Sequence, residues 1–255
     1  MAIKQFLNSH QVFSSHEFAE QFPGSQTDRN LLTRAVSNGT VDKVRRGTYV
    51  SKTGRFTGVR ADPHDVAVAV APDAVFCLMS ALELHGASHN LIRQIQFQTD
   101  TPTTAFTYDG IRYLPQRGQG NRSFTQNLFT RSGHSYRVTT KEQTLIDCLS
   151  NMAGAGGPDN LLHSLSGLAR LDTGLAANIA TASPHSVRAR LGWVLETKGP
   201  DWLVSEDVLS TLARSLGRGP YYFWSTGDLK NHHWVKQWKL YLPNPEQEMA
   251  SWLTR

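Results

Sequence analysis

Residues 31–50, LLTRAVSNGTVDKVRRGTYV, change periodicity near their centre. The first half repeats leucine, alanine and valine at helical spacing, which predicts the buried stripe of a helix. The second half alternates apolar and polar residues around Arg45-Arg46-Gly47, which predicts two short strands and a turn. Gly39 suits the left-handed conformation that ends a helix, so a helix is expected to lead directly into a hairpin.

The sequence before this stretch predicts two more helices. The first is short and covers residues 1–8. The second starts at SSHEFAEQF, where Ser14 and Glu17 have the spacing of a capping box. Pro23-Gly24 then ends that helix and turns the chain. Three helices and a hairpin within about 50 residues are the element order of a winged helix-turn-helix.

Polar residues of the third helix and the hairpin are the candidate DNA contacts. Arginine, asparagine and glutamine on an exposed helix face read guanine and adenine edges in the major groove. Basic residues at a hairpin tip contact phosphates or enter the minor groove. The predicted DNA-binding residues are Gln26, Arg29, Asn30, Thr33, Arg34, Lys43, Arg45, Arg46 and Lys52. An ordinary solvated polar face is the competing interpretation.

The charge distribution also indicates a polyanion partner for the N-terminal segment. The 255-residue chain has a net charge of +5. Residues 1–60 hold nine Lys and Arg against four Asp and Glu, so the whole excess lies there. Double-stranded DNA is such a polyanion.

The remaining sequence predicts a larger mixed region after a polar linker at 51–61. The fold class is therefore α+β, with a winged helix-turn-helix at 1–58 and an α+β domain at 62–255, subdivided near 150–158. The expected helices are one that begins at Asp62, then Asp73–His85, Thr140–Leu149 and most of 158–218. The expected strands lie within Ile92–Leu114, at Tyr136–Thr139 and at Trp234–Leu242. Asp109-Gly110 is the expected hairpin turn within the first of these segments.

The sequence contains no convincing catalytic motif, so a protein without enzymatic activity, metal or cofactor is expected. His85 and His89 are four residues apart, but Gly86 interrupts the helix between them. The glycines at 154–157 lack the lysine and hydroxyl residue of a phosphate loop. A DNA-acting nuclease remains an alternative, motivated by Lys236 and Lys239.

Composition favours a cytoplasmic protein. Residues 1–9 lack the apolar core of a signal peptide, and the longest apolar run, 66–72, is far shorter than a membrane span. Cys77 and Cys148 lie among apolar neighbours and are expected to be buried free thiols. No membrane partner is therefore expected.

Several segments together resemble the AbiEi antitoxins of abortive-infection toxin–antitoxin systems. The similarity begins in VFSSHEFAEQF and in residues 31–50, where Arg46, Gly47 and Tyr49 match an RGxY hairpin. It continues through the stretches MSALELHG (79–86), VTTKEQTLIDCL (138–149) with Gly156-Gly157 after it, and RARLGWVLE (188–196). These segments span most of the chain in the order found in the family.

The resemblance implies a two-part transcription repressor of phage-defence systems. Its winged domain would bind double-stranded DNA repeats in its own promoter, giving autoregulation. Its C-terminal part would counteract a cognate nucleotidyltransferase-type toxin, AbiEii-like in class, through residues that the resemblance does not identify. The alternatives are a winged-helix regulator that is not an antitoxin, a winged domain that mediates assembly, and the nuclease.

Within 188–196, Arg188, Arg190, Trp193 and Glu196 suit either a partner surface or an internal ion-pair network. The aromatic segment from Tyr221 to Trp238 is a candidate protein contact, since exposed Trp and Tyr anchor interfaces, and core packing is the alternative.

Overall fold

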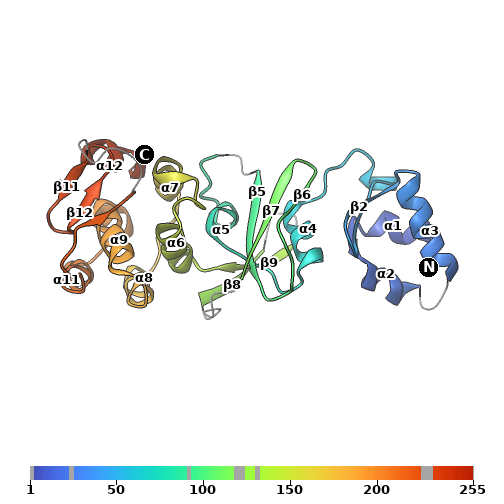
Figure 1. The fold of residues 1–255 in the computed structure, drawn as a ribbon, viewed down its shortest axis with the longest axis horizontal. Coiled ribbons are helices and arrows are strands. Elements are labelled where there is room, and N and C mark those ends of the chain that lie inside the picture. The colour runs from blue at the N-terminus through green and yellow to red at the C-terminus, as the bar shows by residue number, and fades with distance from the viewer. Residues whose placement is uncertain are drawn as a thin grey trace. The chain divides into compact units, whose positions relative to one another are not determined.

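The structure of the protein is a computed structural model that describes residues 3–22, 26–90, 93–117, 124–129, 133–224 and 232–254, without the side chains of 26–29 and 129 (Figure 1). The expected turn at Pro23-Gly24 lies outside these residues. The chain forms two compact units. The first comprises 1–74, 93–95 and 99–117, and the second comprises 75–92, 96–98 and 118–255. The fold is mixed α+β, as the sequence predicts.

The first unit begins with helices followed by a hairpin. Its elements up to residue 56 are α1 (Ile3–Ser9), β1 (Val12–Ser14), α2 (Ser15–Gln21), α3 (Gln26–Ser37), β2 (Val41–Arg45), β3 (Thr48–Ser51) and a 3-10 turn (Gly54–Phe56). The predicted capping box is confirmed, because Ser14 accepts from the Glu17 backbone and the Glu17 carboxylate accepts from Ser14 N–H. Strand β1, which the sequence did not predict, pairs with β3 and gives an antiparallel sheet in the order β1-β3-β2.

A small aromatic core holds these elements together. Phe6 and Phe13 are fully buried, and their rings meet edge to face with centroids 5.2 Å apart. Leu32 and Ala35 bring the buried side of α3 to the same cluster, as the helical spacing predicts. This core fixes α3 against the sheet and leaves its other face to solvent.

Arg45 corrects one detail of the predicted hairpin. The sequence places it in the turn, but the structure places it at the end of β2, paired with Thr48. The turn is Arg46-Gly47, and Gly47 has the left-handed φ of +84° that glycine adopts without strain. A register shift between Lys43 and Arg45 places one extra residue in β2, which alternation alone does not reveal.

The first unit continues with α4 (Pro63–Val70) and the hairpin strands β6 (Phe106–Tyr108) and β7 (Ile111–Arg117). Asp62 caps α4 as predicted, accepting from the His64 backbone at 2.8 Å. Asp109 and Gly110 both have positive φ, at 49° and 76°, which confirms the expected hairpin turn.

A six-stranded mixed sheet has the order β6-β7-β5-β4-β9-β8, with β4 (Val75–Phe76), β5 (Gln94–Thr99), β8 (Thr125–Phe129) and β9 (Ser135–Thr139). Strand β4 is antiparallel to β5 and parallel to β9. The expected helix Asp73–His85 is therefore wrong in its first half, and only α5 (Leu78–Leu84) is helical. Both residues of β4 and Cys77 after it are buried, and such apolar runs do not distinguish a strand from a helix.

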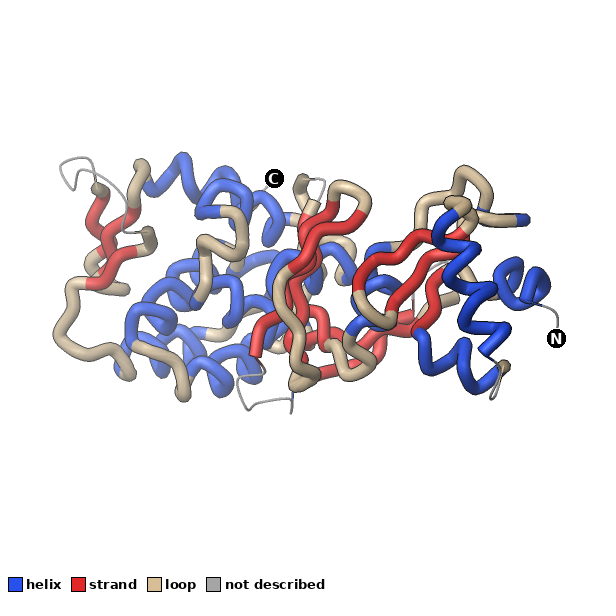
Figure 2. Tube along the Cα trace, turned by 45° about the vertical axis from the view of Figure 1, so that its right-hand side comes forward, coloured by secondary structure: helices blue, strands red, loops and turns tan. Residues whose placement is uncertain are grey.

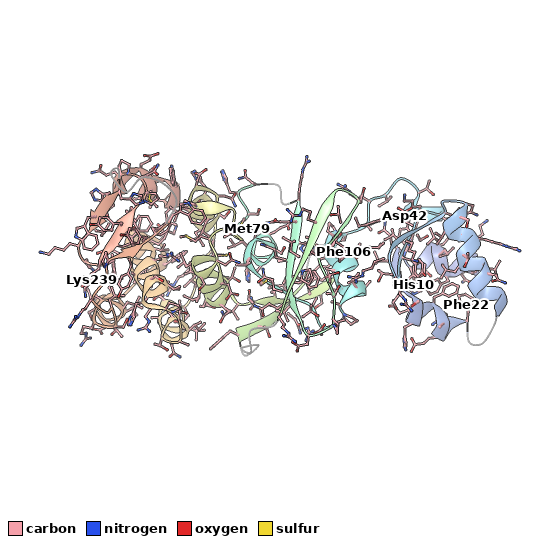
Figure 3. The ribbon with its side chains drawn as sticks, viewed as in Figure 1. His10, Phe22, Asp42, Met79, Phe106 and Lys239 are labelled. Atoms are coloured by element: carbon pink, nitrogen blue, oxygen red, sulfur yellow. The ribbon has the colours of Figure 1, made fainter. Side chains whose placement is uncertain are left out.

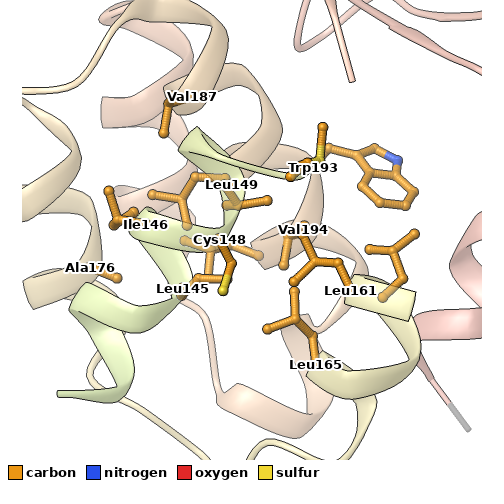
Figure 4. Packing of buried hydrophobic residues seen from close by; sticks show 14 of the residues in the cluster. Leu145, Ile146, Cys148, Leu149, Leu161, Leu165, Ala176, Val187, Trp193 and Val194 are labelled. Atoms are coloured by element: carbon orange, nitrogen blue, oxygen red, sulfur yellow. The ribbon is translucent and has the colours of Figure 1, made fainter. Parts of the chain in front are cut away.

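The second unit is mostly helical (Figure 2). Its further helices are α6 (Lys141–Ser150), α7 (Gly157–Ser166), α8 (Thr173–Ala180), α9 (His185–Thr197), α10 (Gly199–Trp202), α11 (Glu206–Arg214) and α12 (Glu246–Leu253). Figure 4 shows Leu145 and Leu149 of α6 packing with Trp193 and Val194 of α9. Both predicted thiols, Cys77 and Cys148, are free and buried as expected.

The C-terminal segment corrects another expectation. Trp234–Leu242 is a hairpin rather than one strand, with β11 (His233–Val235) and β12 (Leu240–Leu242) joined by a turn. Together with β10 (Tyr221–Tyr222) they form a sheet in the order β10-β12-β11. Lys239 has a φ of 48°, so the backbone reverses there, which alternation along the segment does not reveal.

Candidate nucleic-acid interface

Helix α3 presents three of the predicted polar residues on the face away from its core. Asn30, Thr33 and Arg34 are exposed, whereas Leu32 and Ala35 are 8% exposed. Arg34 lies in the last turn of the helix, where a cation is favoured by the helix dipole. The side chains of Gln26 and Arg29 lie outside the described part of the structure.

The β2–β3 hairpin exposes three of its predicted basic residues. Lys43 lies within β2, Arg46 occupies the turn, and Lys52 follows β3. The turn is anchored, because Ser15 N–H at the start of α2 donates to the Gly47 carbonyl at 2.8 Å. Arg46 is thus carried by a fixed backbone while its side chain remains in solvent.

Arg45 is half-buried, unlike the described side chains of the other predicted residues, and it contacts residues 103–106 of the first unit. Its guanidinium donates to Thr103 Oγ1 and, at 3.4 Å, to the Thr104 carbonyl. Its Cζ also lies 5.2 Å from the centroid of the Phe106 ring, in cation–π geometry. The side chain is therefore held by the segment that leads into β6.

Asp42 connects the same hairpin to the other end of β6. Its carboxylate pairs with Lys52 at 2.6 Å and accepts from the Tyr108 hydroxyl at 3.1 Å. Burial, followed by the Asp42 charge, raises the pKa of Tyr108 well above its usual range, so the hydroxyl remains a donor at neutral pH. Figure 3 labels Asp42 and Phe106 in this part of the fold.

A further ion pair joins the linker to the β6–β7 turn. Arg60 donates to the Asp109 side chain and to its carbonyl. The hydrogen bond from Arg60 lowers the pKa of Asp109 below its usual range. The sequence predicts the Asp109-Gly110 turn but carries no signal of its contact with the linker. Thr103, Phe106 and Tyr108 carry no sequence signal of this role, because about 60 residues separate them from Arg45 and Asp42.

Side chains of the stretch 188–196 make internal hydrogen bonds. Arg188 donates to the carbonyls of Ser183 and Ser215, both at 3.1 Å. Arg190 donates to the Leu149 carbonyl at 2.7 Å and to the Tyr222 carbonyl at 3.0 Å, and burial lowers its pKa.

Two tryptophans on buried positions complete this network. The Trp193 indole donates to Glu246 at 3.1 Å, and the Trp238 indole donates to Glu196 at 2.6 Å. Trp238 is fully buried, which supports core packing for this part of the aromatic segment, whereas Trp234 is 40% exposed.

The residues considered for catalysis have structural contacts. His85 Nε2 lies 2.9 Å from the Thr139 carbonyl, and burial lowers the pKa of this histidine. Lys239, one of the two lysines behind the nuclease alternative, donates to the Gly217 carbonyl at 2.7 Å. Within the described residues, no three His, Cys, Asp or Glu side chains gather as metal ligands would.

Comparison with known families supports the resemblance seen in the sequence. Residues 74–197 match the family model of the AbiEi antitoxin C-terminal domain. This chain carries an AbiEi antitoxin domain. The predicted family is thus confirmed, and the family is one of antitoxins, which are regulatory rather than enzymatic.

The fold of the whole chain is also similar to a solved structure. It matches the crystal structure of the RV2827C protein from Mycobacterium tuberculosis with a TM-score of 0.68 and 13% sequence identity, covering 98% of this chain and 93% of that one. At this identity the match describes the fold alone. No curated protein matches the chain. None of the helices in its described part combines the length and apolar character that crossing a bilayer requires.

Proposed function

We propose that this protein is a DNA-binding antitoxin that represses its own toxin–antitoxin operon. Its first elements, α1 to β3, act as a winged helix-turn-helix. Helix α3 is the recognition helix and the β2–β3 hairpin is the wing. The remaining part of the chain, which contains the AbiEi domain, counteracts a toxin of the nucleotidyltransferase class.

The DNA-binding proposal rests on one observation: exposed polar residues of α3 and an exposed arginine of the hairpin are held by the same small core. Asn30 and Arg34 project from α3 opposite its buried stripe, and Arg46 projects from an anchored turn. A helix in the major groove with a basic hairpin beside it provides base readout and phosphate contacts together. The positive charge of residues 1–60 agrees with this arrangement.

A mobility-shift titration with the DNA upstream of the protein's own gene tests this proposal. Binding should weaken steeply with salt, with a logarithmic slope of about −0.9 per phosphate neutralised. Arg46→Ala should weaken binding to all sequences, whereas Asn30→Ala should reduce the preference for the operator over unrelated DNA. If no upstream fragment binds at low salt, the protein is not an autorepressor.

The antitoxin activity is tested separately from repression. The full chain and its Arg46→Ala variant are expressed from an unrelated promoter beside a neighbouring nucleotidyltransferase-like gene. Both should restore growth equally, because the AbiEi domain spans 74–197 and excludes Arg46. If the wild-type chain does not relieve the growth arrest, the antitoxin proposal is wrong. The DNA-binding proposal is not affected by that result.

An assembly module is the second candidate, and the engagement of Arg45 and Lys52 within the chain favours it. In that case the N-terminal elements mediate protein assembly rather than DNA binding. This candidate expects wild-type promoter repression after Arg45→Ala and Arg46→Ala together. The DNA-binding proposal expects derepression, so one reporter assay distinguishes the two.

A further inference from the structure

We propose that Thr103–Tyr108, named here the hairpin-binding segment, restrains DNA binding by occupying Arg45 of the β2–β3 hairpin. This inference rests on the proposed DNA-binding function and adds an internal competitor for one of its cations. The segment holds the guanidinium with a hydroxyl, a carbonyl and an aromatic face. A DNA phosphate would have to replace these groups.

The chemistry of the contact makes such replacement favourable. Thr103 Oγ1 and the Thr104 carbonyl are neutral acceptors, and the carbonyl is at the long distance of 3.4 Å. A phosphate offers charged oxygens that accept two parallel hydrogen bonds from an arginine, which makes a shorter and stronger contact. Arg45 is only half-buried, so phosphate can approach it without disrupting the core.

The opposite end of the segment engages the hairpin through a negative charge. Tyr108 donates to Asp42, which also pairs with Lys52 at 2.6 Å. A carboxylate on the hairpin opposes an approaching phosphate, and here it also neutralises a predicted DNA-contacting lysine. The segment therefore stabilises an arrangement in which two hairpin cations are already paired.

The core of the N-terminal elements does not depend on this contact. The buried cluster consists of Phe6, Leu7, Phe13, Phe18, Leu32, Ala35 and Val41. None of the described residues of the hairpin-binding segment belongs to it. Arg45 can therefore exchange partners while the packing that orients α3 persists.

The consequence is a two-state equilibrium of the Arg45 side chain. In one state it binds the segment, and in the other it is free for phosphate. The apparent DNA affinity is the affinity of the free state multiplied by the fraction of molecules in that state, so weakening the segment raises the apparent affinity. If the segment instead holds the hairpin in its DNA-binding position, weakening the contact should lower the DNA affinity.

Thr103→Val is the decisive variant, because it removes the hydroxyl acceptor and keeps the side-chain shape. Thr107→Val is its matched control, since Thr107 is exposed on β6 in the same segment. Both full-length proteins are titrated against labelled upstream DNA by fluorescence anisotropy over a salt series, and circular dichroism checks that both are folded. Thr103→Val should bind roughly three- to tenfold more tightly, and its salt slope should steepen by about 0.9, one added phosphate contact.

A second variant shows that the gain acts through Arg45. Adding Arg45→Ala to Thr103→Val should abolish the gain, whereas Arg45→Ala alone should cost less affinity than Arg46→Ala. Unchanged or weaker binding by Thr103→Val overturns the inference. If wild-type protein binds and Arg46→Ala weakens it, this failure leaves the proposed function standing. If neither wild type nor Thr103→Val binds any upstream DNA, both proposals fail.

Discussion

We expect a methyl group added at Gly192 to destabilise the folded AbiEi domain. Gly192 lies in α9, within the stretch 188–196, and the Trp238 ring packs directly on it. A Cβ at this position would overlap Cζ3 and Cε3 of the ring and lie 2.6 Å from Cη2. We therefore expect Gly192→Ala to displace the fully buried Trp238 side chain.

The size of the effect follows from three opposing contributions. Alanine in a helix interior gains about 1 kcal/mol over glycine. Overpacking a core costs about 1–3 kcal/mol, and a hydrogen bond to a charged group contributes about 1.5–3 kcal/mol. The bond at risk joins the Trp238 indole to Glu196 at 2.6 Å. The sum of these contributions predicts that the free energy of unfolding falls by roughly 1.5–5 kcal/mol.

Urea unfolding followed by tryptophan fluorescence measures this loss. Gly199→Ala is the matched control, because nothing lies within 4 Å of a Cβ at the start of α10, and its effect should stay below about 1 kcal/mol. Adding Trp238→Leu should make Gly192→Ala almost neutral, since the overlapping ring atoms are gone. If Gly192→Ala is as stable as wild type or more so, the close packing of α9 on Trp238 is refuted.

Three further predictions concern charge and burial. Burial raises the pKa of Asp147 to about 6, so the unfolded state loses its proton first. The free energy of unfolding should then fall by about 3 kcal/mol as pH rises from about 4 to 7, and Asp147→Asn should remove this dependence in urea titrations at each pH. Burial also raises the pKa of the Cys77 and Cys148 thiols, and a colorimetric thiol reagent should label neither until urea unfolds the protein; labelling of the native protein would contradict their burial. Arg46→Ala should reduce the salt slope of DNA binding by about 0.9, and an unchanged slope would place its side chain away from phosphate.

Local signals were enough for much of the secondary structure. The Ser14–Glu17 capping box, the Asp62 cap and the Asp109-Gly110 turn were all predicted and are confirmed. Each depends on side chains and backbone groups within a few residues, so short sequence windows contain the information. The domain boundaries at 1–58 and 62–255 and the DNA-binding residues stay predictions.

The predicted and observed secondary structures differ where long-range pairing determines the conformation. The sequence predicts that Val75 and Phe76 lie near the start of a helix, but in the structure they form a strand that pairs with β5 and β9. The C-terminal segment read as one strand, but pairing of Trp234 with Tyr241 requires a reversal between them. Neither partner can be identified from the periodicity of the segment itself.

The sequence by itself determined the exposed face of α3, the basic hairpin and the AbiEi resemblance. The exposed face and the hairpin follow from residue type and helical or strand spacing, and the resemblance follows from the matching segments. Only the tertiary structure placed Thr103 and Phe106 against Arg45, and Trp238 against Gly192. These contacts join residues more than 40 positions apart, and their geometry is decided by how the strands and helices pack rather than by any local preference.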